Sequence, residues 1–188
     1  MLSLVNQYIV TLDACVLLPM PLCDTLLRLA EEPAFYLPRW SHETLDEVHR
    51  NLVQKWGYTT EQADRRLSAM RAAFEDAEVT GYESLVPAMT NECDDRHVLA
   101  AAVHCGSHAI VTENVKHFPR QSLDPYGIEL MTADEFLVNQ FHLDPGNVIA
   151  KLNAQAQKKR FTLIELLRLL GSRGTPNFAQ LVSDNAGC

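Results

Sequence analysis

Residues 94–119, DDRHVLAAAVHCGSHAIVTENVKHFP, contain the pattern that decides the fold. The acidic pair Asp94 and Asp95 starts an alanine-rich apolar run that predicts a helix, and Gly106 is placed to end it. The apolar run at 108–111 then predicts a short buried strand. A helix followed at once by a buried strand is typical of a parallel α/β sheet.

The rest of the chain repeats this alternation. Strands are predicted at 8–12, 35–37 (closed by Pro38), 77–79 and 128–131, and helices at 22–30, 41–55, 60–74 and 132–141. Such alternation predicts an α/β fold with three α/β/α layers and a mostly parallel central sheet. Helices near 145, 162–170 and 176–182 predict a C-terminal extension, so we expect one domain over 1–142 and a basic, helical extension over 143–188.

Composition and charge limit the classes of protein that this chain can belong to. A hydrophobic content of 47% excludes general disorder, and no apolar run is long enough to span a membrane. The N-terminus lacks a signal-peptide pattern, and the five cysteines show no metal-binding spacing, so we expect reduced thiols and a cytoplasmic location. The net charge is −8, yet residues 150–188 carry six basic and only two acidic side chains. The acidic excess therefore lies in residues 1–149.

Acidic and amide side chains follow several of the predicted strands. They are Asp13, Glu43, Glu47, Asp94, Asp95, Glu113 and Asn114. The carboxyl ends of parallel strands meet at one edge of a sheet, where ligands bind. Each residue alone has an ordinary explanation, such as a helix cap, a first-turn acid or a turn residue. Together, clustered carboxylates repel each other unless a cation is present, and oxygen donors suit Mg²⁺ or Mn²⁺.

The sequence context carries a family resemblance. The segments TLDACVLLP (11–19), WSHETLDEVHRNL (40–52), the stretch 94–119 and IELMTADEFL (128–137) resemble PIN-domain ribonucleases, above all the VapC-type toxins of bacterial toxin–antitoxin systems. The resemblance covers roughly residues 8–141. It implies an α/β/α fold and an acidic nuclease site that depends on Mg²⁺ or Mn²⁺.

The resemblance also implies roles for individual residues. Asp13, Glu47 and Asp95 match the three acids that hold the metal and are catalytic. Asn114, also a candidate catalytic residue, stands where many members have a fourth acid, and Cys15 stands where many have Asn or Ser. These departures favour one metal ion over two. Second-tier candidates are Asp94, Glu43 and Glu113 beside the metal and Arg96 for the RNA backbone, with Lys116 and the basic stretch 151–160 as further RNA contacts.

The implied function is hydrolysis of RNA phosphodiester bonds by a metal-dependent endoribonuclease, the toxin of a toxin–antitoxin pair. A cognate antitoxin and a homodimer are the implied protein partners, and apolar residues in excess along 41–74 suggest an interface. Asp13→Asn is expected to abolish cleavage and leave the fold stable. Two alternatives stay open: a catalytically inactive PIN-like module that binds RNA or protein, motivated by Cys15 and Asn114, and a phosphotransfer enzyme of another doubly wound family.

Overall fold

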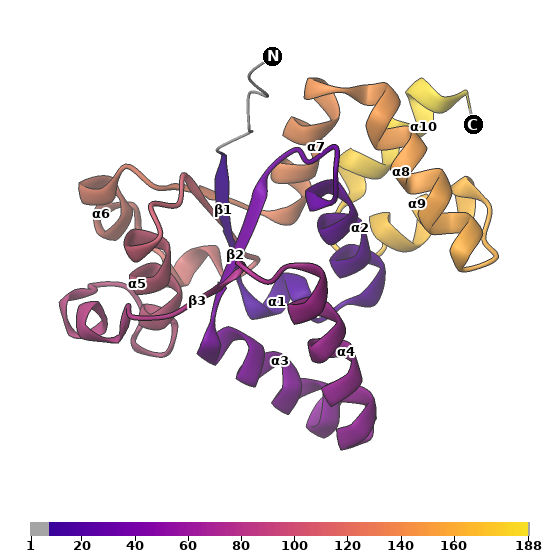
Figure 1. Cartoon of the computed structure of the whole chain (residues 1–188). Coiled ribbons are helices and arrows are strands. Elements are labelled where there is room, and N and C mark those ends of the chain that lie inside the picture. The colour runs from indigo at the N-terminus through magenta and orange to yellow at the C-terminus, as the bar shows by residue number, and fades with distance from the viewer. Residues whose placement is uncertain (1–7, 188) are drawn as a thin grey trace, which may run out of the picture. The chain divides into compact units, whose positions relative to one another are not determined.

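A five-stranded sheet forms the centre of the first part of the chain. The structure is a computed structural model that describes residues 8–187. The strands are β1 (Ile9–Leu12), β2 (Leu37–Ser41), β3 (Glu78–Val79), β4 (Ala109–Val111) and β5 (Glu129–Met131), in the order β3-β2-β1-β4-β5. The pairs β1–β2, β1–β4 and β2–β3 run parallel (Figure 1). The predicted α/β class with a mostly parallel sheet and C-terminal helices is confirmed.

The register of the central strands brings their carboxyl ends together. Leu12 at the end of β1 pairs with Val111 at the end of β4. The next residue, Asp13, donates its backbone N–H to the carbonyl of Val111 at 3.1 Å. The segments that leave β1 and β4 therefore start side by side, which is the arrangement that the sequence predicted for this edge.

Strand β2 differs from the sequence prediction. The prediction placed it at 35–37 and closed it at Pro38, whereas it runs from Leu37 to Ser41 with Pro38 inside. Proline lacks the N–H that a strand needs on its paired sides. β3 pairs with β2 only from Trp40 onward. No strand therefore pairs with β2 at Pro38 on the side of β3, where an N–H of residue 38 would otherwise need an acceptor. The short neighbour explains why proline is tolerated here.

Helices of the first compact unit pack around this sheet. They are α1 (Ala14–Leu17), α3 (His42–Lys55), α4 (Thr60–Ala73), α5 (Arg96–His104) and α6 (Arg120–Leu123), with the 3-10 helices η1 (Glu83–Ala88), η2 (Cys93–Asp95), η3 (Val115–His117) and η4 (Asp124–Tyr126). Helix α5 packs against β1, β2 and β4. Its alanines, Ala100 to Ala102, are fully buried and allow a close approach to the sheet.

The chain divides into two compact units. The first contains the chain up to Leu18 together with Tyr36–Leu130, and the second contains Pro19–Phe35 together with the chain from Met131 onward. Helices of the second unit are α2 (Met20–Ala30), α7 (Ala133–Leu143), α8 (Pro145–Lys158), α9 (Leu163–Gly171) and α10 (Pro176–Ala186). These units are groups of contacts, and the expected domain boundary at 142/143 stays a prediction. None of the helices formed by residues 8–187 is long and apolar enough to cross a membrane.

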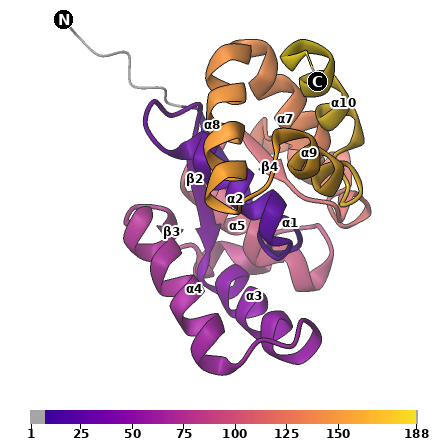
Figure 2. The ribbon, with the colours of Figure 1, turned by 90° about the vertical axis from the view of Figure 1, so that its right-hand side faces the viewer.

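Polar contacts join α2 to the C-terminal helices within the second unit. Lys151 on α8 donates to the carbonyls of Arg28 and Glu31 at the end of α2, both at 2.8 Å. Gln155, one turn later, is buried and donates to the carbonyl of Pro21 at 3.0 Å. The two helices lie side by side (Figure 2). Lys151 is therefore occupied within its own unit, contrary to its predicted role as an RNA contact.

The apolar residues of the α3–α4 hairpin are used by the chain itself. Leu45, Val48 and Leu52 on α3 are fully buried, and Leu67 and Met70 on α4 are buried as well. Helices α3 and α4 pack against each other, and α3 also contacts α1 and α5. Most of the predicted excess of apolar surface on this hairpin is thus absorbed by intramolecular packing, with Trp56 at the end of α3 still 40% exposed. It does not support a dimer interface.

Asp134 on α7 holds the start of α10. Its carboxylate accepts hydrogen bonds from the backbone N–H groups of Asn177 at 3.2 Å and Phe178 at 2.8 Å, and from the Asn177 side chain at 2.7 Å. We expect Asp134→Ala to lower the free energy of unfolding by about 2 kcal/mol, because it leaves a helix N-terminus without its acceptor. Urea denaturation measures this loss. Asp184→Ala, on the exposed side of α10, is the control and should change stability little.

Candidate active site

Asp13 lies at the centre of a buried hydrogen-bond network. It follows β1, occupies the N-cap of α1 and is only 1% exposed. Its Oδ1 accepts from the backbone N–H of Ala14 at 2.6 Å, and its Oδ2 accepts from the Thr112 hydroxyl at 2.6 Å. The carboxylate is therefore held in one orientation by groups that follow β1 and β4.

Thr112 and its neighbours link Asp13 to the loop after β4. The Thr112 hydroxyl accepts from the backbone N–H of Asn114 at 2.9 Å, and the Asn114 side chain donates to Asp13 Oδ2 at 3.5 Å. The Cys15 thiol also donates to Asp13 Oδ2, at 3.3 Å, and accepts from the backbone N–H of Glu113. The two residues that depart from the family pattern, Cys15 and Asn114, thus both contact the first acid.

Asp95 occupies the N-cap position of α5, but its side chain does not cap the helix. It precedes α5 and is 7% exposed, but its side chain makes no hydrogen bond to the helix N-terminus. Instead, its Oδ2 lies 2.5 Å from Nδ1 of His117, which comes from η3. The sequence allowed an N-cap function for Asp94 or Asp95. The carboxylate of Asp95 is turned instead toward the loop that follows β4.

Glu47 lies in the middle of α3, so a favourable interaction with the helix dipole cannot explain why an acidic residue stands there. Its Oε1 accepts from the Asn51 side chain at 3.3 Å. Burial raises the pKa of Glu47, and the negative charges of Asp13 and Asp95 raise it further, while Arg50 opposes the shift. Burial likewise raises the pKa of Asp95, with the charge of Asp13 adding to the effect and the hydrogen bond from His117 opposing it.

The structure thus brings Asp13, Glu47 and Asp95 into mutual electrostatic contact, although they are far apart in the sequence. The charges of Asp13 and Asp95 make the ionised form of Glu47 less favourable, and the charge of Asp13 does the same to Asp95. Such a cluster costs free energy in the absence of a cation. Pairs of raised pKa values in a concave site are typical of functional sites.

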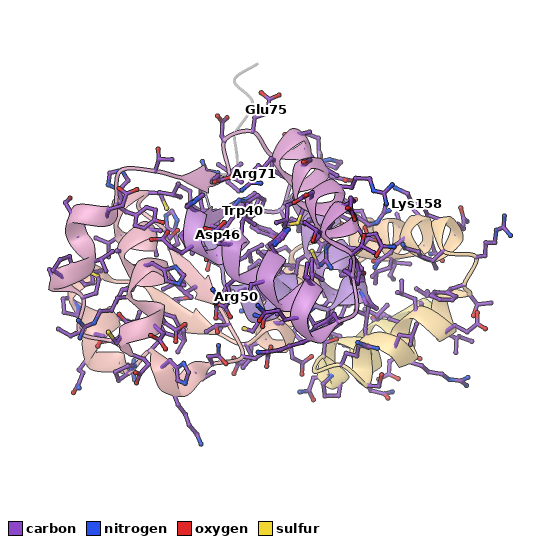
Figure 3. The ribbon with its side chains drawn as sticks, turned by 90° about the horizontal axis from the view of Figure 1, so that it is seen from below. Trp40, Asp46, Arg50, Arg71, Glu75 and Lys158 are labelled. Carbon is purple, nitrogen blue, oxygen red and sulfur yellow. The ribbon has the colours of Figure 1, made fainter. Side chains whose placement is uncertain are left out.

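A cavity of about 600 Å³ opens beside these acids. Its walls are formed by Glu43, Asp46, Glu47, Arg50, Asp94, Asp95, His97, Asn114 and His117. Figure 3 shows Asp46 and Arg50 on successive turns of α3. The predicted candidates Glu43 and Asp94 therefore face the same space as Glu47 and Asp95.

Two second-tier candidates do not line the cavity. Arg96 is half-buried, and its Nε donates to the carbonyl of Asn91 at 3.3 Å. Glu113 takes part in the site through its backbone N–H, which binds the Cys15 thiol. The Nε bond to residue 91 engages one edge of the Arg96 guanidinium, and the role of Arg96 as an RNA contact stays a prediction.

The donor set fits a hydrated hard cation. Within residues 8–187, no group of three or more His, Cys, Asp or Glu side chains is arranged so that it could hold a metal ion directly. Mg²⁺ in proteins is commonly held by one or two carboxylates and several waters, so such a group is not required. Glu43 Oε2 is also buried without a hydrogen-bond partner among the described residues. A carboxylate oxygen left in this state is an acceptor that a hydrated cation can satisfy.

Four residues with a possible function in the site could not be recognised from the sequence. Thr112 and His117 hold the carboxylates of Asp13 and Asp95, while Arg50 and His97 line the cavity. His97 is itself oriented by Ser41, whose hydroxyl lies 2.7 Å from its Nδ1. The position of Thr112 directly after a strand was a usable signal. Nothing in the sequence indicated which way the histidines turn.

Cys15 is expected to resist alkylation. Burial, together with the charge of Asp13, raises the pKa of its thiol to about 12, so almost no thiolate exists at pH 8. Iodoacetamide at pH 8 should label the exposed Cys93 well before Cys15, as measured by mass spectrometry of each cysteine-containing peptide. The same reagent in denaturant should label both thiols. Equal labelling in the native protein would contradict the buried, hydrogen-bonded thiol.

Comparison with known proteins finds relatives over part of the chain. Residues 133–184 match the family described as the VapC50 C-terminal domain. A protein named "Putative ribonuclease VapC50" from Mycobacterium tuberculosis is 51% identical over 63 residues, which cover 34% of this chain and 37% of that protein. The chain resembles a VapC-type PIN ribonuclease. No solved structure matches it significantly.

The likeness to VapC-type ribonucleases has two separate sources. The family match falls on the helices from α7 to α10. Three of the four motifs that first indicated the resemblance, at 11–19, 40–52 and 94–119, lie outside the matched residues and contain the acids of the site, while the fourth, at 128–137, overlaps the start of the match. The segment aligned with the relative, which is 51% identical, spans little more than a third of the relative's length.

Proposed function

We propose that this protein is a metal-dependent endoribonuclease that hydrolyses RNA phosphodiester bonds. The observation that carries the proposal is the group of three coupled carboxylates, Asp13, Glu47 and Asp95, beside an open cavity lined by further acids. An acidic site of this kind repels RNA unless a cation is bound. The VapC-type resemblance supports the assignment.

The proposed cofactor is Mg²⁺ or Mn²⁺. Asp13, Glu47 and Asp95 would hold it, directly or through waters, with Glu43 and Asp94 at the walls of the same cavity. The bound ion would polarise a phosphate oxygen and lower the pKa of a water for in-line attack on phosphorus. The oxygen of that water would bond to phosphorus as the P–O bond to the 3′ oxygen breaks; the water would lose its proton to solvent and the 3′ oxygen would take one from solvent, which leaves a 5′-phosphate and a 3′-hydroxyl.

The chain's own residues would position the reactants. Thr112 and the Ala14 N–H keep the Asp13 carboxylate in one orientation, and His117 does the same for Asp95. Asn114, which lines the cavity and contacts Asp13, and the exposed carboxylate of Asp94 are placed to orient the attacking water. The site needs no histidine as general base in this scheme, because the activated water supplies the nucleophile.

The proposed biological context is a toxin–antitoxin pair. A cognate antitoxin would cover the acidic cavity, and a homodimer is the proposed assembly. Support for both comes from the resemblance to VapC-type toxins alone. Size-exclusion chromatography with light scattering tests the dimer, and co-purification with the product of the neighbouring gene tests the antitoxin.

The decisive experiment is cleavage of total RNA by the purified protein, freed of any antitoxin. Discrete fragments with Mn²⁺ or Mg²⁺, lost on addition of EDTA and restored by excess Mn²⁺, are expected. Glu47→Gln should lose cleavage, while Glu92→Gln, an exposed acid outside the cavity, should keep it. Mn²⁺ calorimetry separates the alternative function: an inactive binding module should neither cleave RNA nor bind Mn²⁺ tightly.

A further inference from the structure

The cavity carries one permanent positive charge. Arg50 is the only lysine or arginine among its described lining residues. It follows Glu43, Asp46 and Glu47 on α3 at spacings of three to seven residues, so one face of the helix carries both the acids and the guanidinium. The sequence analysis did not single out this residue.

Among residues 8–187, no side chain or backbone group forms a hydrogen bond or ion pair with the Arg50 guanidinium. It is exposed and makes no hydrogen bond or ion pair with any residue that the structure describes, although Asp46 and Glu47 lie one turn before it. Two other arginines of the same unit are engaged. Arg71 binds Glu78 at 2.7 Å, and Arg66 binds the backbone carbonyl of Leu18 at 3.1 Å.

A free guanidinium at an acidic cavity has a specific chemical use. Its planar set of donors matches the oxygens of a phosphate, and its charge persists at every physiological pH. Five carboxylates line the cavity, so a polyanion entering it needs a compensating charge besides the cation. The effect of Arg50 on Glu47, whose pKa it lowers, indicates that its charge is felt at the acids.

We propose that Arg50 binds a phosphate of the RNA backbone at the entrance to the cavity. The proposal rests on the ribonuclease function proposed above. It makes Arg50 a substrate-binding residue that contributes to the affinity for RNA and to the position of the RNA in the cavity. Of the sequence candidates for the same task, Arg96 and Lys151 donate to backbone carbonyls, while Lys116 and residues 158–160 stay predicted RNA contacts that do not line this cavity.

The test is the salt dependence of binding to a fluorescein-labelled oligouridylate, measured by anisotropy in Ca²⁺. Arg50→Gln should weaken binding roughly tenfold at low salt, the scale of one charge-assisted contact. It should also lower the slope of log affinity against log salt by about 0.7, the value for one phosphate of a single strand. Arg50→Lys should keep the slope and recover part of the affinity. Lys55→Gln, on the same helix but outside the cavity, should match wild type.

Cleavage and stability measurements complete the test. Arg50→Gln should cleave total RNA more slowly at limiting RNA and at the wild-type rate at saturating RNA and saturating Mn²⁺, with unchanged thermal unfolding. The proposal would be overturned if wild type and Arg50→Gln bound oligouridylate with the same affinity and the same slope of log affinity against log salt, whether that affinity is high or low. The proposal would also be overturned if polyglutamate bound as tightly as oligouridylate and lost affinity to the same extent in Arg50→Gln. That result would mean that Arg50 binds a carboxylate of a partner and not a phosphate. Failure of wild type to cleave RNA would instead overturn the ribonuclease function, while the slope still tests Arg50.

Discussion

Asp95→Asn is expected to reduce RNA cleavage by about 10²- to 10³-fold or more, the scale for loss of one electrostatic group in an active site. The substitution keeps the shape of the side chain and removes its charge. The asparagine oxygen still accepts from His117, so the loop after β4 keeps its contact. The loss should appear in the rate at saturating RNA, measured with Mn²⁺ in excess.

The stability of Asp95→Asn should be equal to that of wild type or slightly higher. Burial and the charge of Asp13 raise the pKa of Asp95, which means that the folded state disfavours the ionised form. An acid with a raised folded-state pKa lowers stability as pH rises above its unfolded value, and a neutral amide removes that cost. Thermal unfolding at pH 7 without metal measures this effect. A strongly destabilised Asp95→Asn would contradict the interpretation of Asp95 as an electrostatically unfavourable, functional acid.

The loss of activity must be separated from a general effect of charge. Asp124→Asn is a suitable control because Asp124 is exposed, belongs to η4 and does not line the cavity. Its variant should cleave RNA at the wild-type rate. Mn²⁺ calorimetry on both variants then distinguishes loss of the cation from loss of a later step, since only Asp95→Asn should weaken Mn²⁺ binding.

The general position of the acids could be predicted from the sequence because it follows from topology. Short buried strands that alternate with helices form a parallel sheet, and residues that follow those strands share one edge. Asp13 after β1 and Asn114 after β4 meet for this reason. The end of β2 could not be predicted in the same way, because Pro38 is tolerated only where β3 is too short to pair with it.

The orientation of side chains within the site was beyond prediction. Spacing allowed Asp95 to be an N-cap, and only the three-dimensional path of η3 brings His117 to its carboxylate. No pattern in the sequence singled out Arg50, since the cavity that it lines is made by segments distant in the sequence. Pattern and topology thus bring the acids to one edge, while their partners depend on loops whose course the sequence does not reveal.

Asp13→Asn is the second substitution with a large expected effect, and here the structure changes the prediction. The sequence suggested a stable fold after loss of the charge. In the structure, Asp13 Oδ2 accepts from the Thr112 hydroxyl and faces the donors of Cys15 and Asn114. An amide nitrogen in that place would oppose these donors. We therefore expect the free energy of unfolding to fall by about 2 kcal/mol, the scale of a lost hydrogen bond to a charged group, in addition to a loss of cleavage.

Glu47→Gln separates the two effects. Glu47 is half-buried and accepts one hydrogen bond, from Asn51 at 3.3 Å, which a glutamine oxygen can also accept. Its variant should lose cleavage as Asp13→Asn does, yet unfold at the same urea concentration as wild type. Urea denaturation of the two variants at pH 7, beside the RNA assay, measures the difference. Equal stability of Asp13→Asn and wild type would mean that relief of repulsion among the acids outweighs the hydrogen bonds to Asp13, and that its carboxylate is positioned at no net cost to the fold.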